Sequence, residues 1–301
     1  MGIRTDLILE MFEEYSKISE EFNCVEEILD DVKISRVEIK DEYGELAFKK
    51  PRGKYVTVDM KNIASMMPDE RKNIVKIIAS ELRGLIGECH SNILVVGLGN
   101  RAITPDSIGP KVCDGIFVTR HIKEYIPEAI DSRAATVFSV APGVLGVTGL
   151  ESAEVVKGIV EQTHPGLVIA IDALAARNTE RIGASIQMTD SGIAPGAGLG
   201  NRRHALNAES LGIKVIAIGV PTVVYASTIA SDIIDEILGE IDNELKKRLI
   251  SKTEGSKGSE LVVTPKDIDN LSTYSAKMIA SAINIAINPY ISDEEIEIYM
   301  S

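Results

Sequence analysis

Short, almost uninterrupted apolar runs recur along the second part of the chain. Four of them lack the polar alternation of a half-exposed strand: Ile93–Val96, Ala135–Val140, Leu167–Ile171 and Val215–Ile218. Segments with helical spacing lie between and after them, predicted at Pro110–Glu124, Gly149–Gln162, Thr228–Leu249 and Ser272–Ile287. Strands buried on both faces have this pattern. It predicts an α/β fold in which a largely parallel central sheet lies between two helical layers, a three-layer αβα arrangement.

The first ninety residues have a different pattern. An amphipathic helix is predicted over Thr5–Phe22, with Thr5 or Asp6 as its cap, and a second helix over Asp69–Leu85. Between them, short β-branched runs broken by glycine and proline predict a meander of hairpins within Val32–Asp59. We therefore expect an N-terminal α+β elaboration at residues 1–90 on an α/β catalytic core at residues 91–301, together forming one compact domain. A polar connection is expected at Ser251–Ser259.

The charge balance narrows the classes of partner. The 301 residues include 45 Asp and Glu against 32 Lys and Arg, a formal net charge of −13. This balance argues against nucleic acid or an anionic membrane as a partner, because both attract clustered cations. The longest uncharged stretch, Val215–Ser231, contains Gly219 and Pro221 and is too short to span a bilayer. With three scattered cysteines, the sequence predicts a soluble, cytoplasmic protein.

A glycine-rich loop follows the first apolar run. Gly97, Gly99 and Asn100 lie in the segment Gly-Leu-Gly-Asn-Arg-Ala, whose spacing matches the dinucleotide-binding fingerprint. Prolines at 105 and 110 displace the next helix downstream, so we interpret the glycines as a tight turn at the sheet edge. A non-catalytic nucleotide-binding module remains an alternative, and no cofactor is predicted.

Two acidic residues are predicted at the same edge of the sheet. Asp106 lies in the loop after the first run, and Asp172 directly follows the run Leu167–Ile171. Ligands of open α/β sheets bind at the carboxyl ends of the strands. Each residue alone fits an ordinary cap, but two neighbouring carboxylates can act as the base and the acid of peptide hydrolysis.

Other candidate chemistry is weaker. Asp190, in Asp-Ser-Gly, matches the short signature of pepsin-like proteases, but the chain has one copy in an α/β context, so Asp190 is a third candidate only. The chain contains neither Gly-x-Ser-x-Gly nor His-Glu-x-x-His. No metal is predicted, although a hard metal held by Asp106, Asp172 and a third group stays an alternative.

Five segments in order along the chain closely resemble the spore germination proteases, from about Arg4 to Ile287. They are Ile3–Leu7, Val95–Asn100, Thr104–Pro110, Asp172–Arg177 and Thr264–Asp269. The resemblance implies an atypical aspartic endopeptidase that begins the degradation of small acid-soluble spore proteins in the spore interior, and a homotetramer. It places the catalytic aspartates at Asp106 and Asp172, with Arg177 as a supporting residue of the second motif.

The family fold resembles those of hydrogenase-maturation endopeptidases and phosphorylases. In the maturation enzymes the corresponding acids bind metal, so a metal-assisted, maturation-type endopeptidase is the alternative mechanism. The family is also made as a zymogen, with a propeptide removed just ahead of a segment like Ile3–Asp6. Here only Met1 and Gly2 precede that segment, which leaves two expectations. Either the chain starts near the mature end, or it lacks the usual autoprocessing.

Overall fold

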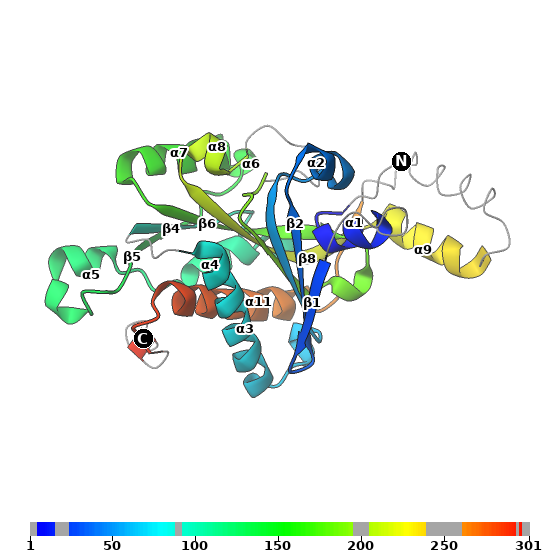
Figure 1. Ribbon diagram of the computed structural model, residues 1–301, viewed down its shortest axis with the longest axis horizontal. Helices are drawn as coiled ribbons and strands as arrows, with labels where there is room; N and C mark the ends of the chain where they lie inside the picture. The colour runs from blue at the N-terminus through cyan, green and yellow to red at the C-terminus, as the bar shows by residue number, and fades with distance from the viewer. Residues whose placement is uncertain are drawn as a thin grey trace.

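The computed structural model describes residues 5–15, 24–87, 92–194, 205–238, 261–292 and 295–296. Within these residues nine strands form one sheet, in the order β1-β2-β3-β7-β8-β6-β4-β5, with β9 paired to β8 (Figure 1). The central strands β5, β4, β6 and β8 are parallel, and the remaining pairs are antiparallel. The strands are β1 (Cys24–Leu29), β2 (Val32–Ile39), β3 (Gly53–Asp59), β4 (Asn92–Gly97), β5 (Thr136–Val140), β6 (Leu167–Ala176), β7 (Ser185–Thr189), β8 (Lys214–Tyr225) and β9 (Val262–Val263).

Helices cover both faces of this sheet (Figure 1). The α-helices are α1 (Ile8–Tyr15), α2 (Glu42–Phe48), α3 (Pro68–Ile86), α4 (Ile108–Asp114), α5 (Arg120–Tyr125), α6 (Leu145–Thr148), α7 (Ser152–Thr163), α8 (Ala208–Leu211), α9 (Ala226–Leu238) and α11 (Ile268–Ile287). The largest apolar cluster joins α3, α4 and α11 to one face, and a second cluster joins α7 to the other. The predicted three-layer αβα fold is thereby confirmed.

The four buried runs are strands, but two of them are longer than predicted. β6 continues five residues past Ile171, and β8 continues through Gly219 and Pro221 to Tyr225. A shift in the β6–β8 register between Leu174 and Ala175 lies opposite Pro221, whose missing N–H interrupts the ladder there. The irregular pairing lets both strands pass the proline.

The predicted helix Pro110–Glu124 is wrong in its middle. The chain forms α4, breaks after Asp114 and resumes as α5 at Arg120. Asn284 of α11 enters the break, where its side chain accepts a hydrogen bond from Phe117 N and donates one to Gly115 O, both at 3.0 Å. These contacts replace the helical hydrogen bonds that the break loses.

The N-terminal strands belong to the same sheet as the core. β7, which the sequence pattern did not predict, pairs with β3 on one side and β8 on the other. The first helix begins at Ile8 and not at the predicted Thr5, because the residues ahead of it are held on β6, where Asp6 hydrogen-bonds with Ala175. The rest of the predicted helices Thr5–Phe22 and Thr228–Leu249, and the connection Ser251–Ser259, lie outside the described residues.

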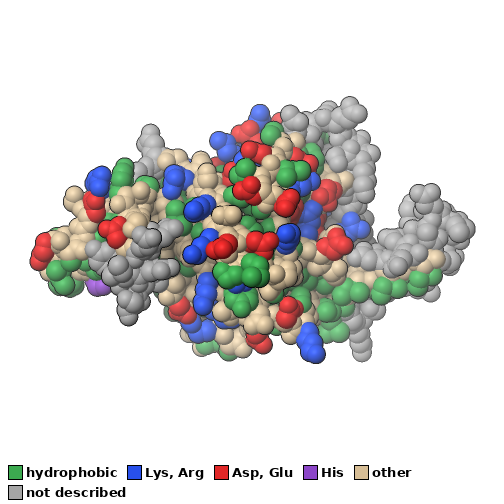
Figure 2. All heavy atoms as spheres, turned by 90° about the horizontal axis from the view of Figure 1, so that it is seen from below, with side chains coloured by type: hydrophobic (Ala, Val, Ile, Leu, Met, Phe, Trp, Pro, Cys, Tyr) green, Lys and Arg blue, Asp and Glu red, His purple; other side chains and the backbone are tan. Residues whose placement is uncertain are grey.

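On the face of the molecule seen in Figure 2, the described residues form no separate acidic or basic patch. Acidic and basic side chains are interspersed there, with hydrophobic side chains between them. In the described part of the chain, no helix combines the length and apolar character needed to cross a bilayer.

Candidate active site

β4 ends at a point where the neighbouring strand β6 continues. Gly97, the last residue of β4, pairs with Ile171, and Leu98 N then donates to Ile171 O at 2.8 Å before the chain turns away. Asp172 is the next residue of β6. The sequence pattern suggests that Asp172 lies at the end of the strand, but in the structure it lies inside β6. Because β4 ends at Gly97, β4 does not pair with β6 at Asp172.

Asp106 lies at the end of the 3-10 turn Thr104–Asp106, which follows the glycine loop. Its Oδ2 accepts a hydrogen bond from Asn100 N at 2.7 Å. Gly99 has φ +107°, and a Cβ there would lie 2.1 Å from Asp106 O. Only glycine fits this position without displacing the turn. The loop is a tight turn, the interpretation preferred from its sequence, and it fixes Asp106.

The start of α4 packs directly onto the ends of β4 and β6. A Cβ on Gly97 would meet Gly109 O at 2.1 Å, and a Cβ on Gly109 would meet Ile171 O at 2.7 Å. These two glycines allow main chain to touch main chain between the helix and the strands. The close approach brings the turn that carries Asp106 to the place where Asp172 emerges.

The two carboxyl groups have different surroundings. Asp172 is 8% exposed. Burial, then the charge of Asp106, raises the pKa of Asp172 to about 8, against an opposing hydrogen bond from Ala173 N at 2.9 Å. Asp106 is half-buried; burial also raises its pKa, and the hydrogen bond from Asn100 N lowers it. At neutral pH Asp172 thus holds a proton, and the less buried Asp106 is the better carrier of the negative charge.

Asp190 and Arg177 hydrogen-bond with other parts of the chain, whereas Asn100 contacts Asp106 through its main chain. Asp190 ends the β3–β7 ladder: its Oδ1 accepts from Lys54 N at 2.7 Å, and Lys54 O accepts from Asp190 N. Arg177 follows β6 and is half-buried, with its N–H donating to Glu10. The side chain of Asn100 accepts from Ala102 N and closes the glycine loop.

One neighbour of the pair was not foreseen as such. Asp6 raises the pKa of Asp172 as the smallest of three contributions, after burial and Asp106. The sequence predicts Asp6 as a helix cap. It gives no sign of the contact with Ala175 of β6, which lies 169 residues further along the chain.

Two carboxyl groups are few for a metal centre held by protein side chains alone. Ca²⁺ takes six to eight oxygen ligands, whereas Mg²⁺ can be held by one or two carboxylates with water completing its shell. Among the described residues, no group of three or more His, Cys, Asp or Glu side chains is placed to hold a metal ion. Asp106 and Asp172 bring two carboxyl groups, one of them protonated at neutral pH, so no step below depends on a metal.

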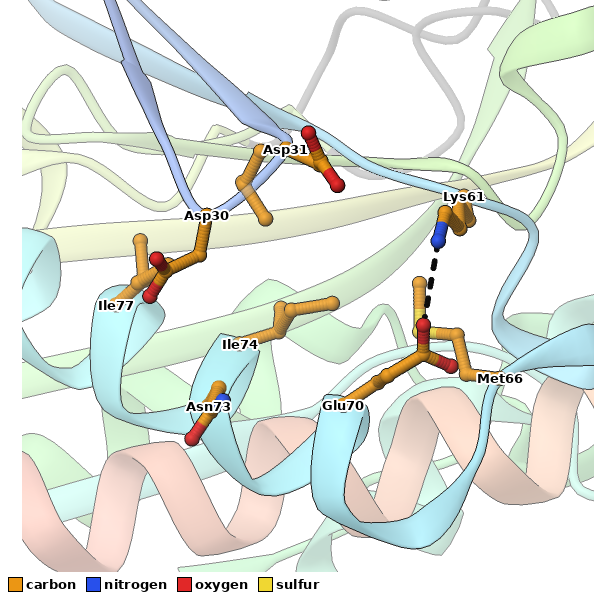
Figure 3. Close-up of a pocket in the computed structure, with 9 residues that line it drawn as sticks. Asp30, Asp31, Lys61, Met66, Glu70, Asn73, Ile74 and Ile77 are labelled. Atoms are coloured by element: carbon orange, nitrogen blue, oxygen red, sulfur yellow. Dashed lines mark hydrogen bonds and ion pairs between the residues drawn. The ribbon is translucent and has the colours of Figure 1, made fainter.

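A pocket elsewhere on the molecule shares no residue with the aspartate pair. It lies between the β1–β2 turn at Asp30 and Asp31 and the start of α3. Figure 3 shows Lys61 paired with Glu70 across it, at 3.2 Å, above the apolar side chains of Met66 and Ile74.

The matching family model and the similar curated proteins carry the same description. The family model described as germination protease matches residues 6–247 and 236–300. A germination protease of Clostridium tetani is 42% identical, with all of both chains covered. One from Priestia megaterium is 36% identical over 89% of this chain and 86% of its own. A [NiFe] hydrogenase maturation protease HycI from Thermococcus kodakarensis matches with 18% identity and a TM-score of 0.37, covering 69% of this chain and 98% of its own.

Proposed function

This chain belongs to the germination protease family, and we propose that Asp106 and Asp172 are the catalytic pair of its peptidase activity. Under this proposal the protein is an aspartic endopeptidase. The observation that carries it is the pairing itself: a buried carboxyl group with a pKa of about 8 near a second, half-buried carboxyl group from the turn after β4. Groups with opposed protonation at neutral pH are what acid–base hydrolysis requires.

The roles follow from burial. Asp106, half-buried and held by Asn100 N, carries the charge and takes a proton from the attacking water. Asp172, deeply buried, carries the proton and delivers it to the nitrogen of the leaving amine as the C–N bond breaks. The water oxygen becomes part of the new carboxyl group, and each aspartate ends in the form in which the other began. A proton must return from Asp106 to Asp172 before the next cycle.

We also infer the biological setting from the family resemblance. The substrates are small acid-soluble spore proteins, the place is the spore interior, the enzyme is a homotetramer, and a zymogen precedes the mature form. The five ordered motifs and the relatives named germination protease support this assignment. Sedimentation equilibrium of the purified chain tests the tetramer: a mass near 130 kDa, about four times 32.5 kDa, is expected, and a monomer would contradict it.

A digest of a purified small acid-soluble spore protein, read by mass spectrometry, tests the catalytic assignment. Asp106→Asn and Asp172→Asn should each lose at least about a thousandfold in kcat/KM, as expected when an acid or a base is removed from a coupled pair. Asp190→Asn is the matched control. It keeps an acceptor for Lys54 N and should cut at the rate of the unmodified protein.

Two outcomes would overturn the proposal. If either Asp106→Asn or Asp172→Asn, shown to be folded by circular dichroism, cut at the unmodified rate, the catalytic pair would be wrong. If exhaustive chelation abolished cleavage and a divalent cation restored it, the metal-assisted alternative would replace the proton-transfer mechanism. Cleavage that survives chelation and is lost in both variants supports the aspartic assignment.

A further inference from the structure

The N-terminal segment Thr5–Glu10, which becomes helical at Ile8, lies beside β6, the strand that carries Asp172. We call it the strap. It passes along the part of β6 beyond Asp172, where Asp6 N donates to Ala175 O at 2.9 Å. It ends in the first turn of α1. The strap thus connects the N-terminal helix to the strand that carries the proposed acid.

Side chains clamp the strap to the sheet from both directions. The buried side chain of Gln187, on β7, accepts from Ile8 N at 2.7 Å and donates to Asp6 O at 3.3 Å. The carboxylate of Glu10, 4% exposed, accepts from Arg177 N and Asn178 N, both at 2.8 Å, where β6 ends. A buried carboxylate with two N–H donors is held far more firmly than a surface side chain. The strap is therefore a fixed part of the sheet edge.

Apolar side chains fasten the strap on its other sides. Leu7 is fully buried in a cluster with Leu174 and Ala176 of β6. Ile8 and Leu9, also buried, point into a separate cluster with residues of β2, β3 and α2. Burial of these three large aliphatic side chains stabilises the docked strap.

Asp6 is a residue of the strap that contacts β6 close to Asp172. Its Oδ2 accepts from Ala175 N at 2.9 Å while its own N–H donates to Ala175 O, so two hydrogen bonds hold one residue of β6. This residue adjoins the irregularity between Leu174 and Ala175, where the β6–β8 ladder gives the strand least support. Among the residues that the structure describes, two negative charges act on Asp172: Asp106, from the turn after β4, and Asp6, from the strap.

We propose that Asp6 is a positioning residue of the active site: its carboxylate fixes β6 at Ala175 and places a negative charge near Asp172. The inference rests on the proposed function of Asp172 as the acid. The charge of Asp6 makes ionisation of Asp172 less favourable, and so extends to higher pH the range over which the acid keeps its proton. The strap then serves catalysis through β6 without touching the substrate.

The test separates charge from hydrogen bonding. Asp6→Asn keeps an acceptor for Ala175 N and removes the charge, whereas Asp6→Glu keeps the charge. Glu124→Gln, on the exposed side of α5, removes one charge elsewhere and is the matched control. The profile of kcat/KM against pH is measured on a spore-protein substrate for all four proteins. The alkaline limb should move to lower pH in Asp6→Asn. It should stay in place in Asp6→Glu and Glu124→Gln.

Each result has a distinct meaning. An Asp6→Asn profile that superimposes on that of the unmodified protein overturns the inference while leaving the catalytic pair intact. Activity in Asp172→Asn, run in the same assay, overturns the catalytic pair and the inference with it. If Asp6→Asn does not fold, Asp6→Ser, which also offers Ala175 N an acceptor, takes its place with the same expected shift.

Discussion

Replacing Asp172 by Asn should make the folded protein more stable at neutral pH while it abolishes activity. Asn has nearly the shape of a protonated aspartic acid, keeps an acceptor for Ala173 N, and cannot ionise. The unmodified protein must hold a carboxyl group in a site that disfavours its charge. That cost is present in the folded state and absent from the unfolded chain, so removing it stabilises the fold.

The sign and size of the effect follow from the pKa. In the unfolded chain Asp172 titrates near 3.8, and in the folded protein its pKa is raised to about 8. Between these values the folded state keeps a proton that the unfolded state releases, so the free energy of unfolding falls as pH rises, by about 1.4 kcal/mol per pH unit. Over the three units from 3.8 to pH 7 this amounts to about 4 kcal/mol, an order-of-magnitude figure.

Equilibrium urea unfolding, followed by far-UV circular dichroism at intervals from pH 4.5 to 8.5, measures this difference. The stability of Asp172→Asn minus that of the unmodified protein should be small at pH 4.5, rise by a few kcal/mol by pH 7 and level off above about pH 8. A difference for Asp172→Asn that stayed constant across the range would refute the raised pKa, and with it the assignment of Asp172 as the acid.

Three further outcomes are expected. Gly99→Ala should lower the free energy of unfolding by about 2–4 kcal/mol, because φ is positive there and the added Cβ overlaps Asp106 O, and it should cut activity at least about tenfold. Gly149→Ala is the control: φ is +74°, but an added Cβ would have no atom within 4 Å, so it should cost about 1 kcal/mol and leave activity unchanged. Urea unfolding and the cleavage rate measure both variants. Arg181→Met should destabilise the protein by about 3 kcal/mol in the same unfolding assay, because the carboxylates that pair with Arg181 would lose their cation in a largely buried site. A loss below about 0.5 kcal/mol would contradict this. Burial raises the pKa of the Cys113 thiol to about 11, so iodoacetamide at pH 8 should label Cys113 only after unfolding, as peptide mass mapping would show.

The predictable part of the fold is the part governed by local apolar runs. The buried strands were identified because a strand covered on both faces needs apolar residues throughout, and the parallel arrangement follows from the helices between them. The same pattern placed Asp106 and Asp172 near one sheet edge. The pattern places the end of β8 too early, because Gly219 and Pro221 are typical of a strand end. In the structure β8 continues past them through an irregular pairing with β6.

The parts that could not be predicted depend on distant partners. β7 has alternating polar residues that look exposed in sequence. In the structure Ser185 donates to Asp59 and Gln187 holds the strap, so the polar groups are satisfied while the strand is buried. The contact of Asp6 with Ala175 and that of Asn284 with Gly115 likewise join residues more than 160 positions apart. No local pattern announces such pairs.

The pairing of β3 with β7 sets an order of events during synthesis. Asp59 and its partner Ser185 are 126 residues apart, so the first strands leave the ribosome long before their neighbour exists. Until then β1–β3 is a hairpin meander with an open edge at β3, the kind of surface that pairs with other chains. Pairing of β3 with β7, and docking of the strap on Gln187, must wait until residue 189 has emerged. A chaperone that shields a strand edge would therefore raise the yield of active enzyme more than one that acts on the finished chain.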